Sequence, residues 1–136
     1  MARTSRELKD REGIAALAVL ARRREASLRA ALARLTEAAR EADAEVVASE
    51  RACEAQRHAW QDALLRGGVY GQREADGASR AVEAQRAALG EAQARHGSAL
   101  ARAKQAEANL RAQREHLQAN ARKQEKLREL LRLYRS

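Results

Sequence analysis

Hydrophobic residues recur at alternating steps of three and four along the second half of the chain. Sixteen positions in this spacing contain no Asp, Glu, Lys or Arg, although 34% of the chain is charged. They are Val82, Gln85, Leu89, Ala92, His96, Ala99, Ala103, Ala106, Leu110, Gln113, Leu117, Asn120, Gln124, Leu127, Leu131 and Tyr134. A random frame would avoid charge over so many positions only about once in a thousand. The spacing is the heptad pattern of a coiled coil, and its period predicts a left-handed supercoil.

The first half of the chain carries an uncharged stripe with the same spacing. Its eleven positions are Leu28, Leu32, Leu35, Ala39, Ala42, Val46, Ser49, Cys53, Gln56, Trp60 and Ala63. Ile14, Leu17 and Ala21 continue this stripe toward the N-terminus. Their phase slips near Arg24, and such a slip predicts a local stutter in the coiled coil.

Three glycines, Gly67, Gly68 and Gly71, lie close together near the midpoint of the chain. They separate a predicted helix over about 5–66, a turn over about 67–72 and a predicted helix over about 73–134. Because a short connection joins antiparallel neighbours, the sequence predicts an all-α fold. Two long helices form an antiparallel coiled-coil hairpin with a central Gly-rich turn, as a single domain over residues 1–136. Thr4 or Ser5 is the expected cap of the first helix, and Asp76 that of the second.

The fold-back point also predicts which residues face each other. Folding about residues 68–70 places Leu28 near Leu110 and Val46 near Ala92, so that large side chains meet small ones. Polar stripe residues fix the register at a cost in stability. They are Gln85, His96, Gln113, Asn120 and Gln124. Because the stripe is rich in alanine, we expect modest stability, which a partner or a homodimer that forms a four-helix bundle would increase.

The net charge of +8 is concentrated at the two ends of the chain. Residues 1–24 carry a net charge of +4, residues 111–136 carry +5, and the span between them carries −1. An antiparallel hairpin brings both basic ends, with their leucines, to one pole. Three interpretations remain open: a solvated face, a nucleic-acid surface, or a surface that docks onto an acidic protein. Bases that alternate with acids, and few aromatics for stacking, argue against nucleic acid. Apolar residues among the bases favour a protein partner.

Residues able to carry chemistry are sparse. His58, His96 and His116 do not pair on one helical face, so we expect no metal site. The glycine cluster lacks the Lys-Ser/Thr that ends a phosphate-binding loop. No nucleophile is paired with a base, and we expect a non-enzyme without a cofactor. The single cysteine, Cys53, excludes an internal disulfide. No run approaches the roughly 20 apolar residues that span a bilayer, so we expect no membrane insertion.

Trp60 is the only tryptophan, and it lies on the stripe just before the glycine cluster. One interpretation is a side chain that closes the end of the hydrophobic seam. The other is an anchor for a partner protein. Leu64, Leu65, Val69 and Tyr70 would extend such an anchor.

The basic, proline-free hairpin resembles the stalk proteins of type III secretion ATPases, the FliJ/YscO/HrpO-like class. The resemblance covers the whole chain and rests on the two stripes and the central turn. It also includes the motifs Leu20-Ala21-Arg22-Arg23-Arg24-Glu25 and Gln124-Glu125-Lys126-Leu127. It implies a cytoplasmic interaction protein peripheral to the inner-membrane secretion apparatus. Its paired termini would enter the hexameric export ATPase, its loop end would reach the export gate membrane protein, and it would also meet secretion chaperones.

Carried onto this sequence, the resemblance assigns residues to both ends. The implied ATPase-binding residues are Arg22, Arg23, Arg24, Lys123, Lys126, Arg128, Leu130 and Leu133. The implied gate-facing residues are Trp60, Leu64, Leu65, Val69 and Tyr70. The alternatives are a basic nucleic-acid-associated coiled coil and a scaffold or adaptor hairpin of another assembly.

Overall fold

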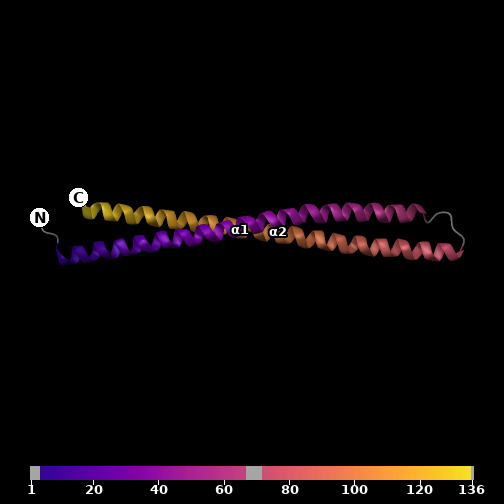
Figure 1. Cartoon of the computed structure of the whole chain (residues 1–136), viewed down its shortest axis with the longest axis horizontal. Helices are drawn as coiled ribbons and strands as arrows, with labels where there is room; N and C mark the ends of the chain where they lie inside the picture. The colour runs from indigo at the N-terminus through magenta and orange to yellow at the C-terminus, as the bar shows by residue number, and fades with distance from the viewer. Residues whose placement is uncertain (1–3, 67–71, 136) are drawn as a thin grey trace. The chain divides into compact units, whose positions relative to one another are not determined.

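The computed structural model describes residues 4–66 and 72–135 and contains two helices. Helix α1 spans Ser5–Arg66 and helix α2 spans Gln72–Arg135. The helices run antiparallel and pack against each other (Figure 1). The all-α hairpin predicted from the sequence is therefore confirmed, and the helix boundaries agree with the predicted ones to within one residue. The predicted glycine turn at residues 67–71 lies outside the described residues.

The start of α1 is fixed by a capping box. The Glu7 N–H donates to Thr4 Oγ1 at 3.2 Å, and the Thr4 N–H donates to Glu7 Oε2 at 3.3 Å. These two bonds satisfy backbone donors that have no partner within the first turn of a helix. Thr4, one of the two expected caps, is therefore the cap of α1. The expectation for Asp76 is wrong, because α2 begins at Gln72 and Asp76 lies inside the helix.

Both predicted stripes face inward. All eleven positions of the first stripe and all sixteen of the second are buried or half-buried. The residues around them on both helices are mostly exposed, as expected where each helix has a single neighbour. The seam between α1 and α2 is therefore the core of this fold.

The chain divides into two units that share this architecture. We call the segments Met1–Glu37 and Ala108–Ser136 the terminal unit, and Ala38–Glu107 the loop unit. In each unit, a segment of α1 packs antiparallel to a segment of α2.

Polar pairs cross the seam of the loop unit. Ser49 Oγ donates to the Val46 carbonyl at 2.9 Å and lies 2.9 Å from His96 Nδ1. Since the only hydroxyl proton is used in the first bond, the His96 Nδ1–H is the donor in the second. The side-chain amides of Gln56 and Gln85 also bond to each other. These pairs satisfy polar groups that an apolar seam would leave without partners.

The observed register differs from the predicted one by about one helical turn. Gln113 Nε2 donates to the Leu28 carbonyl at 3.0 Å, whereas the prediction placed Leu110 there. Ala92, expected near Val46, lines a groove with Ser49 instead. The glycine cluster gives only an approximate fold-back point, whereas the polar pairs fix the alignment because a shift would leave their donors unpaired.

Candidate functional site

The stripe of α1 continues without a slip through the terminal unit. Its inward positions are Arg11, Ile14, Ala18, Ala21, Glu25 and Leu28, in steps of three and four. The stutter predicted near Arg24 is therefore wrong. Leu17, which was placed on the stripe, is 51% exposed. The prediction failed because it assumed that every stripe position is uncharged, whereas the charged Glu25 occupies one of them.

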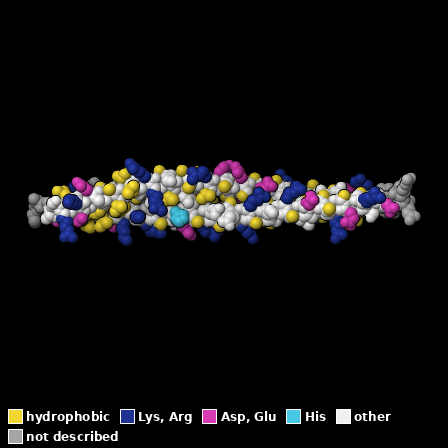
Figure 2. Space-filling view, turned by 90° about the horizontal axis from the view of Figure 1, so that it is seen from below, with side chains coloured by type: hydrophobic (Ala, Val, Ile, Leu, Met, Phe, Trp, Pro, Cys, Tyr) yellow, Lys and Arg dark blue, Asp and Glu magenta, His cyan; other side chains and the backbone are white. Residues whose placement is uncertain are grey.

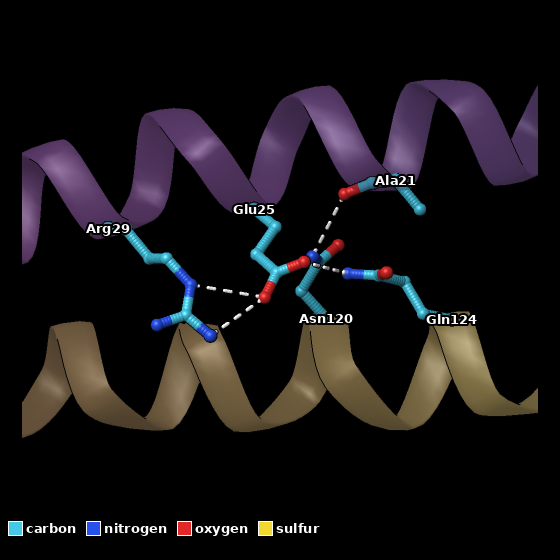
Figure 3. A network of polar contacts seen from close by, with 5 residues as sticks. All are labelled: Ala21, Glu25, Arg29, Asn120 and Gln124. Carbon is cyan, nitrogen blue, oxygen red and sulfur yellow. Dashed lines mark hydrogen bonds and ion pairs between the residues drawn. The ribbon is translucent and has the colours of Figure 1, made fainter.

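A network of amide side chains accommodates Glu25 in the seam (Figure 3). From α2, Gln124 Nε2 donates to Glu25 Oε2 at 2.9 Å, and Asn120 Nδ2 donates to the Ala21 carbonyl at 3.0 Å. From α1, the Arg29 guanidinium donates to Glu25 Oε1 at 3.1 and 2.9 Å. Asn120 and Gln124 are both buried. The network therefore joins the two helices of the terminal unit at one alignment.

The same network lowers the pKa of Glu25 below its ordinary value. The hydrogen bond from Gln124 is the largest cause, and the bond from Arg29 is the second. Both stabilise the ionised carboxylate, while partial burial opposes the shift. Because the folded-state pKa is the lower one, ionised Glu25 stabilises the fold above the unfolded-state pKa. This contribution is lost as the pH falls through the folded-state pKa.

We expect a pH-dependent difference in stability between the wild type and Glu25→Gln. At neutral pH the wild type has the higher melting temperature, since the variant lacks the carboxylate that Gln124 and Arg29 stabilise. The difference should shrink as the pH falls through the acid range, because Glu25 becomes protonated in the wild type. Thermal unfolding followed by circular dichroism at several pH values measures both curves. A difference that stays constant at all pH values would contradict the assigned role of Glu25.

The eight residues assigned to the ATPase end are all exposed in the terminal unit. They do not form one cluster. Arg24 and Lys123 line a common groove, together with His116 and Asn120. Arg22 and Arg23 are adjacent to Arg24 in sequence, and successive residues on a helix differ in direction by about 100°. The basic triplet Arg22–Arg24 is therefore divided among different sides of α1.

Arg128 also differs from the groove-lining cations. Its guanidinium lies 3.4 Å from the Glu125 carboxylate, and its positive charge contributes to the lowered pKa of Glu25. Its charge is therefore partly neutralised within the terminal unit.

The residues assigned to the loop end are only partly described. Trp60 is half-buried on the seam, and its Nε1 is buried with no hydrogen-bond partner among the described residues. This position agrees with a side chain that fills the seam. Leu64 and Leu65 are exposed, the latter to 81%. Val69 and Tyr70 lie outside the described residues.

Sequence reasoning missed two features of the terminal unit. One is Glu25, which the uninterrupted spacing through Ala21 and Leu28 would have revealed. The other is the exposure of Leu17 and Leu20, at 51% and 58%, in the unit that also exposes Leu130 and Leu133. Continuing the heptad through Glu25 would have placed Leu17 and Leu20 off the seam.

Within the described part of the chain, no three His, Cys, Asp or Glu side chains gather closely enough to hold a metal ion. One groove of the loop unit is lined by alanines and charged side chains alone. The described parts of the two helices contain no stretch that is long and apolar enough to cross a membrane. Comparison with models of known protein families, with curated proteins and with solved structures gave no match to this chain.

Proposed function

We propose that this chain is a non-enzymatic stalk of a type III secretion system, which binds the hexameric export ATPase through its paired termini. One observation carries this proposal: both basic ends of the chain belong to one unit, which also exposes Leu17, Leu20, Leu130 and Leu133. Such a combination suits a protein partner, because the leucines gain by leaving water while the cations select an acidic surface.

The second half of the proposal concerns the loop end. There the chain would meet the export gate, with Leu64 and Leu65 as contact residues because they are exposed next to the half-buried Trp60. The protein would work in the cytoplasm, at the inner-membrane secretion apparatus. The architectural resemblance to the stalk class supports this part.

Charge reversal at the paired termini tests the proposal. We expect Arg22→Glu/Arg23→Glu/Arg24→Glu, and separately Lys123→Glu/Lys126→Glu/Arg128→Glu, to weaken binding to the secretion ATPase of the same organism about tenfold or more. Binding is measured by surface plasmon resonance with purified ATPase hexamers. Circular dichroism checks that helicity is retained.

A matched control changes the same amount of charge in the loop unit. Arg51→Glu/Arg57→Glu/Arg80→Glu alters three exposed arginines there. It should leave ATPase affinity within about twofold, since these arginines do not belong to the unit that is proposed to bind. Equal losses in control and terminal variants would indicate a nonspecific charge effect. Wild-type protein that does not bind the ATPase would end the proposal.

A further inference from the structure

Four leucines near the two ends of the chain are exposed. Leu17 and Leu20 of α1 are 51% and 58% exposed, and Leu130 and Leu133 of α2 are 41% and 71% exposed. We call these four residues the leucine face. In Figure 2, hydrophobic side chains gather near the end of the terminal unit that holds both termini, with Lys and Arg side chains around them. Exposed apolar groups that gather in this way mark interaction surfaces more often than scattered ones do.

The heptad places all four leucines along one edge of the helix pair. Residues seven apart fall on the same line of a coiled-coil helix. Leu17 is therefore in line with Arg24, and Leu130 is in line with Lys123. Arg24 and Lys123 line one groove between α1 and α2, so the two lines border the same edge. Leu20 and Leu133 each lie three residues further along, on the adjacent line of the same edge.

Three cations lie along this edge: Arg24, Lys123 and Lys126, which is seven residues from Leu133 and therefore in line with it. Arg24, Lys123 and Lys126 form no ion pair with any residue that the structure describes. Elsewhere in the unit, the Arg29 guanidinium lies 2.9 Å from Glu25, and that of Arg128 lies 3.4 Å from Glu125. A partner on the leucine face therefore meets both apolar side chains and cations that are not held in ion pairs by the described residues.

We propose that the leucine face binds an amphipathic helix whose apolar stripe is flanked by Asp and Glu. Two antiparallel helices present a groove along their edge, and a third helix fits it by packing its apolar side chains between leucines from both sides. Leu17 to Arg24 rises about 10 Å along α1 and Lys123 to Leu133 about 15 Å along α2, so a helix of about four to five turns covers the leucines and the cations together. Charge decides against a second copy of this chain, because its own cations would then approach Arg24 and Lys123.

This inference rests on the proposed function only for the identity of the protein that contributes the helix. It also refines that function, because it assigns docking to Arg24 and Lys123 and not to their neighbours Arg23 and Arg122. Arg23 and Arg122 are equally basic and exposed, but each points about 100° away around its helix. These neighbours supply a control with the same change of charge.

A display library tests the proposal without a known partner. The probe is a library of 20-residue peptides in which fixed alanines favour a helix and all other positions are randomised. Peptides that bind the purified wild-type protein in about 100 mM salt are selected. We expect enriched peptides to carry heptad-spaced Leu or Ile flanked by Asp or Glu, and their affinity to fall with salt. The affinity of the enriched peptides should fall about tenfold in each of two double variants, Arg24→Glu/Lys123→Glu and Leu17→Gln/Leu20→Gln. Arg23→Glu/Arg122→Glu should leave their affinity within about twofold. Circular dichroism must show equal helicity for all variants.

Several results would overturn the proposal. These are a selection that enriches no peptide, enriched peptides without an acidic excess, or equal losses of affinity in the Arg24/Lys123 and Arg23/Arg122 variants.

Self-association that depends on Leu17 and Leu20 in sedimentation equilibrium would assign the face to a second copy. Leucine-dependent binding to vesicles of 70% phosphatidylcholine and 30% phosphatidylglycerol, with no peptide enriched, would assign it to a membrane surface. Failure to bind the secretion ATPase while acidic peptides still bind would remove the proposed function and leave the leucine face intact.

Discussion

Leu127→Ala is expected to lower the free energy of unfolding of the terminal unit by about 2 to 3 kcal/mol. Leu127 is 8% exposed, and among the described residues of the terminal unit it is the one large apolar side chain that is buried. Truncation to alanine removes apolar surface that is buried on folding, and the neighbouring side chains, which are exposed to solvent, do not fill the space that is left. The expected loss lies at the low end of the usual range, because water can enter beside a two-helix seam.

Hydrogen exchange measured by mass spectrometry checks this effect and locates it. Peptides from residues 108–135 should exchange faster in Leu127→Ala, whereas peptides from the loop unit should change less. Leu130→Ala is the matched control, since it removes the same atoms from an exposed leucine one turn away, and it should change stability by less than about 0.5 kcal/mol. Equal effects of the two substitutions would contradict the assignment of the seam.

Ala99→Glu is expected to destabilise the loop unit by about 3 kcal/mol. Ala99 is 1% exposed, the lowest exposure of any residue in the buried core. A carboxylate there loses hydration, and it enters a groove that Ala99 shares with two acids, Glu41 and Glu45, and one cation, Arg102. Both burial and like charge therefore act against the ionised side chain.

Two control substitutions separate these causes. Ala99→Lys should destabilise the unit less than Ala99→Glu, because a long stem lets the ammonium group reach Glu41 or Glu45. Ser98→Glu, at the adjacent exposed position, should have almost no effect. Chemical denaturation of the three variants gives the free energies of unfolding. A lysine variant as unstable as the glutamate variant would show that packing alone decides, and that the acids across the groove have no role.

The alternation of three and four residues was sufficient to predict the fold. Every stripe position from Leu28 to Ala63 and from Val82 to Tyr134 faces inward, because a heptad pattern depends only on residues close in sequence. The same pattern failed around Glu25. A carboxylate in a seam is tolerated only when distant side chains satisfy it, and Gln124 lies about one hundred residues away in the chain. Periodicity alone carries no information about such a partner.

The sequence predicted where the candidate site lies, but not how its side chains are arranged around the two helices. Net charges of the two chain ends, together with a hairpin, were enough to predict a basic pole. They could not show that Arg24 and Lys123 share a groove while Arg22 and Arg23 point elsewhere. Nor could they show that Leu17 is exposed beside Leu20, since the phase of α1 depends on how Glu25 is accommodated.

By itself, the sequence determined two long antiparallel helices, their boundaries, the residues along their seam and the gathering of positive charge at the chain ends. Only the tertiary structure decided the register, the ionic environment of Glu25 and the edge on which leucines and cations combine. The physical reason is the range of the interactions. Helix formation and amphipathic spacing arise between residues one or two turns apart, whereas register and edge depend on hydrogen bonds such as that from Asn120 to Ala21, which form only when distant parts of the chain pack together.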